Sequence, residues 1–319
     1  MENKVKVSII IPVYNAGEFL RPCLDTLINQ TLREIELVCV LDCPTDGSDK
    51  VVEEYAAKDD RIVVVKNEHN LNIGETRNVG IRIAQGKYVG FSDHDDTRKL
   101  DMYEKLYEAA EQGENVIVIT GKLGNYVSQF QPDMQLEKAF LSILGRTASS
   151  HVTPCLYDRR FLLDNGISFI DNNTCTPEDT IFNAEVLSAA IARQSKVFAM
   201  PCDFYNHIDF NSNQNKSYSH WAFGKVLKGI HRISSIAEST SADAGQKQTR
   251  LSIYCIKGLY TSFIRECGKN GIMNTIRLFK TLKDDAVVVK CVANCPHSGY
   301  GLTISKRLFL IWLKKHCVR

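Results

Sequence analysis

The feature that most constrains the fold is an alternation, over the first 120 residues, between short apolar runs and segments with helical periodicity. The apolar runs predict strands at 7–13, 36–41, 62–66, 88–92 and 116–120, and the intervening segments predict helices at 16–29, 46–57, 75–84 and 100–111. Most of the runs are apolar throughout, which is typical of strands covered on both faces. This rhythm predicts an α/β fold with a mostly parallel sheet flanked by helices.

Composition narrows the class of protein and its partners. A chain of 319 residues, 44% hydrophobic and 24% charged, is ordinary for one large or two modest globular domains. Its 39 basic and 37 acidic residues leave a net charge of +2, too small for a long-range field that would recruit nucleic acid. We therefore expect no nucleic-acid partner.

The predicted cellular compartment is the cytoplasm. The first four residues run into a strand pattern without the charged, apolar and small regions of a signal peptide, and no apolar run approaches the roughly 20 residues that span a bilayer. Eleven cysteines, an odd number, favour reduced thiols. The sequence Cys291-x-x-x-Cys295-Pro-His297 lacks a second ligand pair, which does not favour a zinc site.

Polar residues follow the predicted strands at the ends where ligands bind in open parallel sheets. The most acidic set contains Asp93, Asp95 and Asp96, three carboxylates within four residues. Their mutual repulsion would raise their pKa values unless a cation offsets it, and Mg²⁺ or Mn²⁺ suits such hard oxygen ligands. The alternative is an exposed acidic turn that caps the next helix. The position directly after a strand favours the metal.

The ordered motifs carry a resemblance to a known family. They are VSIIIPVYN at 7–15, LDTLINQT at 24–31, DCPTDGS at 42–48, RNVG at 77–80 and DHDD at 93–96. Together they resemble the family 2 inverting glycosyltransferases, densely over residues 5 to about 110. The resemblance implies a GT-A (Rossmann-like) fold, a nucleotide-sugar donor across the ends of the sheet, and Mn²⁺ or Mg²⁺ on its diphosphate.

The resemblance also implies roles for single residues of the donor site. Pro12, Val13 and Tyr14 would cradle the base and ribose, and Asp42 would accept a hydrogen bond from uracil or an equivalent base. Arg77 would stabilise the nucleotide end. The residues alone leave alternatives open, since a strand-end aromatic often packs on the core and a helix arginine is often solvated.

The metal set implied by the resemblance has Asp95 as its principal ligand, with Asp93 facing the ribose or the metal. His94 would support the nucleotide-sugar or be an exposed side chain. His207 would reach the diphosphate and its metal, or be a structural histidine.

An acidic pair at Glu178-Asp179 opens a predicted apolar helix in the second half of the chain. It resembles the family's acceptor motif, which implies Asp179 as the general base and Glu178 as its neighbour in the acceptor pocket. The alternative is a pair of charges that complement the positive end of the helix dipole.

The predicted domains are a GT-A domain at 1–218 and a helical C-terminal region at 219–319. Residues 1–115 would bind the nucleotide-sugar and residues 116–218 the acceptor. The apolar and basic stretch at 304–319 suits either a helix packed on the protein or one lying on an anionic membrane surface. The membrane interpretation implies peripheral contact at the inner face of the cell membrane and a lipid-linked acceptor.

The predicted function is therefore an inverting glycosyltransferase of polysaccharide biosynthesis. It would move a sugar from a UDP-sugar to a saccharide or lipid-linked saccharide. A nucleotidyltransferase is one alternative, although residues 12–18 lack the Gly-rich, basic phosphate loop of such enzymes. A non-catalytic carbohydrate-binding relative is the other, against which the intact acidic sets argue.

Overall fold

The computed structural model describes residues 5–113, 115–123, 126–127, 135–147, 151–206, 222–297 and 301–318. Its chain divides into two compact units. The first contains Met1–Leu136, His151–Asp171 and Arg193–Phe210, and the second contains Glu137–Ser150, Asn172–Ala192 and Asn211–Arg319.

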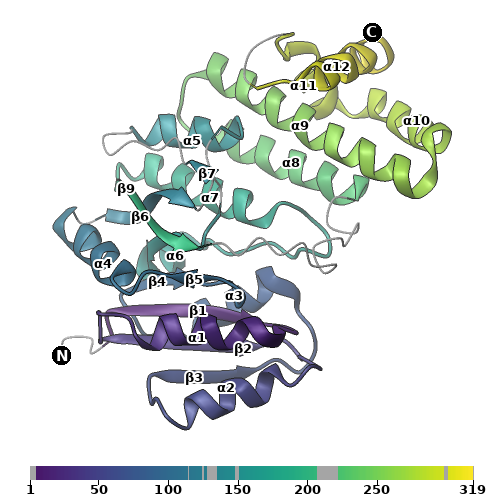
Figure 1. Cartoon of the computed structure of the whole chain (residues 1–319). Coiled ribbons are helices and arrows are strands. Elements are labelled where there is room, and N and C mark those ends of the chain that lie inside the picture. The colour runs from purple at the N-terminus through teal and green to yellow at the C-terminus, as the bar shows by residue number, and fades with distance from the viewer. Residues whose placement is uncertain are drawn as a thin grey trace. The chain divides into compact units, whose positions relative to one another are not determined.

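Four parallel strands form the N-terminal half of the sheet in the first unit (Figure 1). They are β1 (Val7–Val13), β2 (Ile35–Leu41), β3 (Ile62–Lys66) and β4 (Tyr88–Phe91). Their order is β3-β2-β1-β4, so the chain first adds strands on one side of β1 and then crosses to the other. Between β1 and β4 the strand order reverses, and open α/β sheets bind ligands at such a point.

The sheet continues beyond β4 with strands of both directions. Within the described residues the full order is β3-β2-β1-β4-β8-β6-β9-β5, with β7 paired to β6. The added strands are β5 (Thr97–Arg98), β6 (Asn115–Leu123), β7 (Tyr126–Val127), β8 (Cys155–Asp158) and β9 (Lys196–Asn206). β8 is antiparallel to β4 and β6, whereas β6 and β9 are parallel to each other. The predicted, mostly parallel α/β sheet is confirmed.

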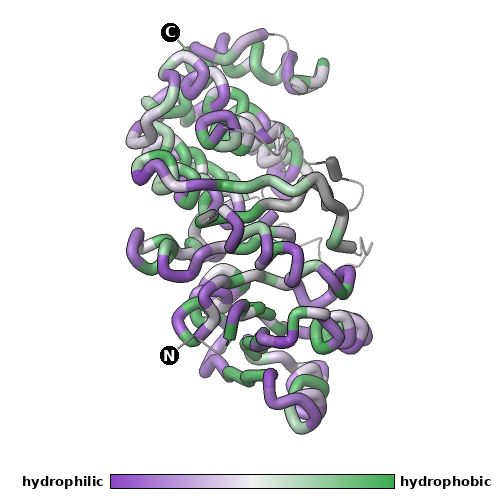
Figure 2. Tube along the Cα trace, turned by 90° about the vertical axis from the view of Figure 1, so that its left-hand side faces the viewer, coloured by the Kyte–Doolittle hydropathy of each residue, from purple (hydrophilic) through white to green (hydrophobic). Residues whose placement is uncertain are grey.

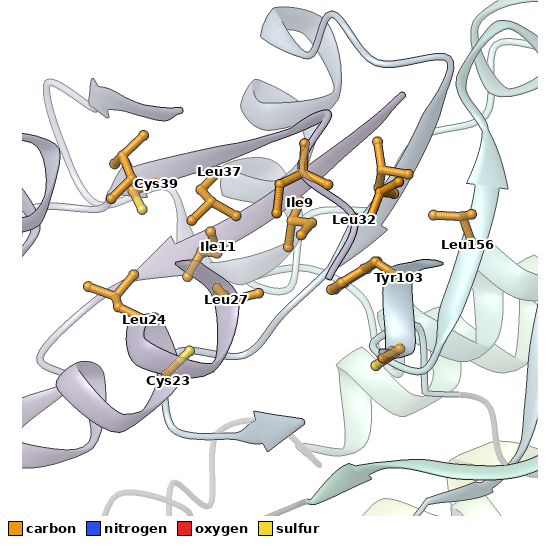
Figure 3. Close-up of a cluster of buried hydrophobic side chains, with 14 of the residues drawn as sticks. Ile9, Ile11, Cys23, Leu24, Leu27, Leu32, Leu37, Cys39, Tyr103 and Leu156 are labelled. Atoms are coloured by element: carbon orange, nitrogen blue, oxygen red, sulfur yellow. The ribbon is translucent and has the colours of Figure 1, made fainter. Parts of the chain in front are cut away.

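Helices cover both faces of β1. On one face, its odd-numbered residues join α1 (Leu20–Ile28) and α4 (Met102–Gly113) in a core that includes Ile9, Leu24 and Tyr103 (Figure 3). On the other face, Ile10 packs against α3 (Asn72–Ile83), where a Cβ on Gly80 would lie only 2.3 Å from Ile10 Cγ2. Two covered faces explain why the strand is apolar without alternation.

The second unit is helical. Its elements are α5 (Leu136–Leu144), α7 (Glu178–Ala192), α8 (Phe223–Ser239), α9 (Ala244–Asn270), α10 (Ile272–Lys280), η3 (Thr281–Asp284), α11 (Ala286–Asn294) and α12 (Ile304–Cys317). The long helix α9 contacts α8, α10, α11 and α12. The ring of Phe263 lies 5.2 Å from Phe279 and 5.1 Å from Phe309, centroid to centroid. The predicted C-terminal helical extension is confirmed.

Hydrophilic and hydrophobic residues both occur along the helical segments drawn in Figure 2. Among the described residues, no helix is both long and apolar enough to cross a membrane. By their contacts, α5 and α7 belong to the helical unit, although the sequence placed them in the acceptor-binding half at 116–218. The division into donor and acceptor halves stays a prediction.

Candidate active site

The ends of β1 and β4 are joined by a half-buried histidine. Nδ1 of His94 lies 3.0 Å from the carbonyl oxygen of Pro12. A carbonyl oxygen only accepts, so Nδ1 must carry the hydrogen. His94 thus ties the acidic turn to β1 at the point where the strand order reverses. This contact favours the predicted supporting role of His94 over a freely exposed side chain.

Asp42, at the end of β2, holds the beginning of α3. Its carboxylate is buried and accepts hydrogen bonds from the amide of Leu71 at 2.7 Å, the amide of Asn72 at 3.0 Å and the side chain of Asn67 at 2.8 Å. Leu71 occupies the N-cap of α3 and has no side-chain acceptor of its own. Asp42 therefore supplies the cap, and its charge suits the positive end of the helix dipole. Its predicted contact with the base stays a prediction.

Strained backbone gathers at the same edge. Asn15 after β1, Cys43 after β2 and Asn72 at the start of α3 have φ values of 48°, 58° and 64°. Positive φ is uncommon for residues other than glycine, and such strain concentrates at functional sites. The side-chain oxygen of Asn15 accepts a hydrogen bond from the Thr45 amide at 2.7 Å, which fastens the loop after β2 to the end of β1.

Asp46 fastens these two loops a second time. Its carboxylate accepts hydrogen bonds from the amides of Gly17 at 2.8 Å and Ser48 at 3.0 Å, and the Ser48 hydroxyl accepts one from the amide of Ala16 at 3.0 Å. Burial acts to raise the pKa of Asp46, but the hydrogen bonds outweigh it and the pKa is lowered. The charged form therefore stabilises the loop arrangement.

Among the three residues predicted to cradle the base, only Tyr14 exposes its side chain. Pro12 and Val13 are buried inside β1, whereas 47% of Tyr14 is accessible. The alternative of an aromatic side chain packed on the core is therefore wrong for Tyr14. Pro12 and Val13 shape this end of the sheet through their backbone.

Arg77 is buried on α3 rather than solvated. Its Nη2 donates to Oδ1 of Asp93 at 2.9 Å, and its guanidinium carbon lies 5.1 Å from the ring centroid of Phe169 and 5.9 Å from that of Phe91. Burial acts to raise the pKa of Asp93, but the charge and hydrogen bond of Arg77, together with the charges of His94 and His151, outweigh it and the pKa is lowered. Asp93 is thus held in its charged form.

Asp95 sits in the opposite electrostatic situation. Burial, followed by repulsion from Asp93 and Asp96, raises the pKa of Asp95, and His94 opposes the rise only in part. Asp96 is fully buried, so the acidic cluster is not simply an exposed turn. A divalent cation would offset the repulsion at Asp95.

The donor atoms available for such a cation are few. In the described part of the chain, no three His, Cys, Asp or Glu side chains are arranged to hold a metal, and His207 lies outside the described residues. Asp95 and Asp93 remain. One or two carboxylates, completed by water and substrate phosphate, are the set that Mg²⁺ commonly uses, so the residues present fit the expected ion.

Three residues that contact or influence Arg77 and Asp93 could not be predicted from the sequence. His151, ahead of β8, acts electrostatically to lower the pKa of Asp93. Phe169 lies beside Arg77, and its backbone exchanges two hydrogen bonds with the side chain of Asn78, at 2.8 and 2.9 Å. Cys23 donates its thiol hydrogen to the Asp93 carbonyl at 3.4 Å. No local motif marks these residues, because their roles come from packing between distant segments.

The predicted acceptor motif opens α7 in the second unit. Glu178 and Asp179 lie half-buried in its first turn. Helix α8 passes against the preceding residues so closely that a Cβ on Gly229 would lie 1.9 Å from the Thr176 carbonyl oxygen. Lys225 of the same helix donates to the Asn172 carbonyl at 2.8 Å. Helix α8 thus supports the segment that leads into the acidic pair.

Two curated relatives align with part of the chain. EpsJ of Bacillus subtilis, an uncharacterized glycosyltransferase, is 43% identical over 115 residues, covering 36% of this chain and 33% of EpsJ. A poly(ribitol-phosphate) beta-glucosyltransferase of Bacillus spizizenii is 36% identical over 122 residues, covering 37% and 19% respectively. The matched part therefore spans a third or less of the length of either relative.

Solved structures match nearly the whole chain. TarS of S. aureus in complex with UDP-GlcNAc superposes with a TM-score of 0.71 at 19% identity, covering 98% of this chain and 88% of TarS. The mannosyltransferase PcManGT of Pyrobaculum calidifontis, in complex with GDP-Man and Mn²⁺, has a TM-score of 0.59 at 16% identity, covering 97% and 86%. These likenesses confirm the predicted GT-A fold.

The model of one family, Glycosyl transferase family 2, matches residues 8–172, just over half of the chain. The match includes β1, the loop after β2, the helix that carries Arg77 and the acidic turn at Asp93–Asp96. These are the elements that build the sheet edge described above, and the chain belongs to glycosyl transferase family 2.

Proposed function

We propose that this glycosyltransferase is an inverting, metal-dependent enzyme that moves a sugar from a UDP-sugar to a saccharide or lipid-linked saccharide in polysaccharide biosynthesis. The observation that carries the proposal is the convergence of three groups where the strand order reverses. These are the exposed ring of Tyr14, the Arg77–Asp93 pair and the electrostatically strained carboxyl of Asp95.

The base and ribose would lie at the ends of β1 and β2. There Tyr14 offers an aromatic face, and Asn15 and Cys43 hold the loops in fixed, strained conformations. The choice of uridine is supported by TarS, whose structure holds UDP-GlcNAc, whereas PcManGT holds GDP-Man. A comparison of UDP-sugars with GDP-mannose will therefore identify the nucleobase that the donor site accepts.

Asp95, with Asp93 beside it, would hold Mn²⁺ or Mg²⁺. When bound, the cation neutralises negative charge on the departing nucleoside diphosphate. The structural relative with Mn²⁺ supports this assignment. The chain's own contribution is positional: Arg77 keeps Asp93 ionised, and His94 fixes the turn to β1. His207 as a further ligand stays a prediction.

Asp179 would act as the general base, with Glu178 as its neighbour in the acceptor pocket. As the acceptor oxygen forms a bond to the anomeric carbon, Asp179 would take the hydroxyl proton while the bond from that carbon to the diphosphate breaks. One such displacement inverts the configuration at the anomeric carbon. The half-buried position of Asp179, in a turn that α8 supports, suits a base that must be held in place.

Family membership favours sugar transfer over the nucleotidyltransferase alternative. The beta-glucosyltransferase among the relatives is named for a poly(ribitol-phosphate) acceptor, which supports a polymeric acceptor for this chain as well. The alternative of a non-catalytic carbohydrate-binding relative predicts donor binding without turnover, and the two experiments below separate it from the proposal.

The donor and metal assignments are tested by thermal unfolding with UDP-GlcNAc, UDP-glucose and GDP-mannose, each with and without Mn²⁺. A ligand that binds only the folded state raises its Tm. We expect a UDP-sugar to raise the Tm only when Mn²⁺ is present, and Asp95→Asn to lose this response without a lower Tm of its own. The matched control is Asp101→Asn, an exposed carboxylate in the segment after the turn. An undiminished response in Asp95→Asn would show that the metal assignment is wrong.

The base assignment is tested by Asp179→Asn. We expect the donor-induced rise in Tm to persist while transfer to an acceptor falls by about 10²- to 10⁴-fold, the usual contribution of a general base. Glu178→Gln should reduce transfer less. Normal turnover by Asp179→Asn would place the base elsewhere, and absence of turnover in the unmodified protein with every donor bound would favour the non-catalytic alternative.

A further inference from the structure

The C-terminal helix α12 has one face on the protein and another in solvent. The side chains of the inward face are buried, namely Phe309, Leu310, Leu313 and Cys317. On the outward face, Ile304, Leu308 and Ile311 are 76%, 62% and 53% exposed. Their spacing places them in a single stripe along the helix, hereafter the α12 ridge. Packing on the protein therefore leaves the ridge unused.

Positive charge surrounds this ridge. Helix α12 contains five basic side chains and no acidic one, the basic ones being Lys306, Arg307, Lys314, Lys315 and His316. Lys315 is exposed and continues the spacing of the ridge by one turn. Trp312 lies half-buried beside the stripe and stacks on His316 with ring centroids 4.8 Å apart. An aliphatic stripe bordered by cations and a tryptophan is the composition of helices that lie in a membrane interface.

Further cations lie at the N-terminal end of the helix. Lys257 of α9 donates to the carbonyl of Gly145 at 3.1 Å, and burial together with the charges of Arg146, Lys306 and Arg250 lowers the pKa of Lys257 to about 8. The first turn of α12 thus belongs to a cluster of like charges.

The acidic groups on the packed neighbours do not reverse this balance. On α9, the carboxylate of Glu266 accepts hydrogen bonds from the amide of Phe223 at 3.1 Å and from the side chain of Asn270 at 2.6 Å. Element η3 packs against α12 and carries the exposed Asp284, but Lys283 precedes it directly and Lys280 ends α10 just before. The field around the ridge therefore remains positive.

We propose that the α12 ridge and its surrounding cations form a docking surface for an anionic lipid bilayer. A second copy of the chain would also cover apolar residues, but a symmetric pair would set the basic ends of the two helices against each other. Anionic headgroups provide the opposite charge instead. The proposal concerns where the enzyme works and does not depend on the assigned donor or base.

The geometry suits a helix that lies flat. Fourteen residues at about 1.5 Å each give a length of about 21 Å, with Ile304 near one end and Lys315 near the other. The three aliphatic side chains would enter the boundary between headgroups and acyl chains, and the cations would face the lipid phosphates. Binding should therefore need both apolar and ionic contributions, and it should weaken as salt screens the charges.

The experiment is co-sedimentation of the full chain with vesicles of phosphatidylcholine alone or mixed with phosphatidylglycerol. We expect binding to the anionic vesicles only, and its loss at high salt. Leu308→Ser/Ile311→Ser should lower the partition coefficient by at least about tenfold. Lys306→Gln/Lys315→Gln should lower it by about 25-fold, since each cation near such a surface contributes about fivefold.

The matched control is Leu100→Ser/Leu163→Ser, because these leucines of the first unit are 47% and 46% exposed and lie on separate segments, so they form no apolar stripe along one helix. The control should bind like the unmodified chain, and thermal unfolding should show that all variants fold. Two outcomes of the vesicle assay would overturn the proposal. One is binding by Leu308→Ser/Ile311→Ser that equals binding by the unmodified chain, and the other is binding to neutral vesicles that equals binding to anionic ones. A dimer in sedimentation equilibrium that Leu308→Ser/Ile311→Ser dissociates would also overturn it, since the ridge would then serve a second copy. The donor-induced rise in Tm should be unchanged in every variant, which separates this test from the function assigned above.

Discussion

The contact between α8 and the acceptor segment gives a prediction that a single methyl group can test. In Gly229→Ala, the new Cβ would lie 1.9 Å from the Thr176 carbonyl oxygen and 3.0 Å from its carbon. Both are backbone atoms, so no side-chain rotation relieves the clash. Ordinary contact begins at 3.4 Å, so the helix and the turn must separate by the difference between 3.4 and 1.9 Å, about 1.5 Å.

The energetic cost can be isolated with a second glycine on the same helix. Overpacking of this kind lowers the free energy of unfolding by about 1–3 kcal/mol, whereas replacing glycine by alanine within a helix raises it by up to about 1 kcal/mol. A Cβ on Gly224 would meet nothing within 4 Å, so Gly224→Ala has the helical gain without the clash. The free energies of unfolding of the two variants, measured with urea, should therefore differ by about 1–3 kcal/mol, with Gly229→Ala the less stable.

The same shift should reach catalysis, because Thr176 lies two residues before Glu178 and three before Asp179. Misplacing a catalytic group by about 1 Å commonly costs about a hundredfold in rate, so we expect kcat for Gly229→Ala to fall by about that factor. The donor-induced rise in Tm should remain. Equal stability of the two alanine variants would refute the packing argument. A destabilised Gly229→Ala whose folded fraction turns over normally would refute the role of α8 in holding the acidic pair.

Two further predictions concern buried charge. Arg77→Met should lower the free energy of unfolding at neutral pH by about 3 kcal/mol, the low end for a broken buried pair, because 29% of the Asp93 side chain is exposed. The folded pKa of Asp93 lies below its unfolded value, so the pair's contribution is present above the unfolded pKa and lost as pH falls through the folded one. As the pH is lowered into the acidic range, the free energy of unfolding measured with urea should therefore fall less in Arg77→Met than in the unmodified chain. An equal fall in both would contradict the pairing. Lys257 has a folded pKa of about 8, below its ordinary 10.5, so its charged form disfavours folding and stability should rise between those pH values. Lys257→Met should remove that rise and be more stable at neutral pH by no more than about 3 kcal/mol, and a rise that persists in the variant would contradict the assignment.

The parallel strands could be predicted from sequence because their signal is local. A strand covered on both faces is a continuous apolar run, and the predicted strands at 7–13 and 62–66 coincide with β1 and β3. The positions of Tyr14, Asp42 and Asp93 followed from the rule that ligands meet the carboxyl ends of such strands. The metal, the base and the roles of Glu178 and Asp179 rest on the family resemblance and await the tests above.

What the sequence did not reveal depends on distant partners. The two-residue strand β5 exists only because Thr97 and Arg98 pair with the end of β9, more than a hundred residues later. Arg77 reads as a solvated helix charge until Phe169 covers it. Nor does any local pattern tell that the carboxylate of Asp42 caps α3, because the cap and the helix belong to separate segments.

That cap makes α3 a direct structural link between the two ends of the proposed donor site. Asp42 fixes its first residue, and Arg77, in its second turn, fixes Asp93. Affinity for the nucleoside and affinity for the diphosphate should therefore depend on each other, because a change at one end of α3 shifts the helix and so moves the residues at its other end. Nucleoside alone and pyrophosphate alone should each bind with only part of the affinity of the joined nucleoside diphosphate. In a double-mutant cycle, substitutions of Asp42 and Asp93 should be strongly non-additive in donor affinity. Altering the preferred base would then require compensating changes along the whole of α3.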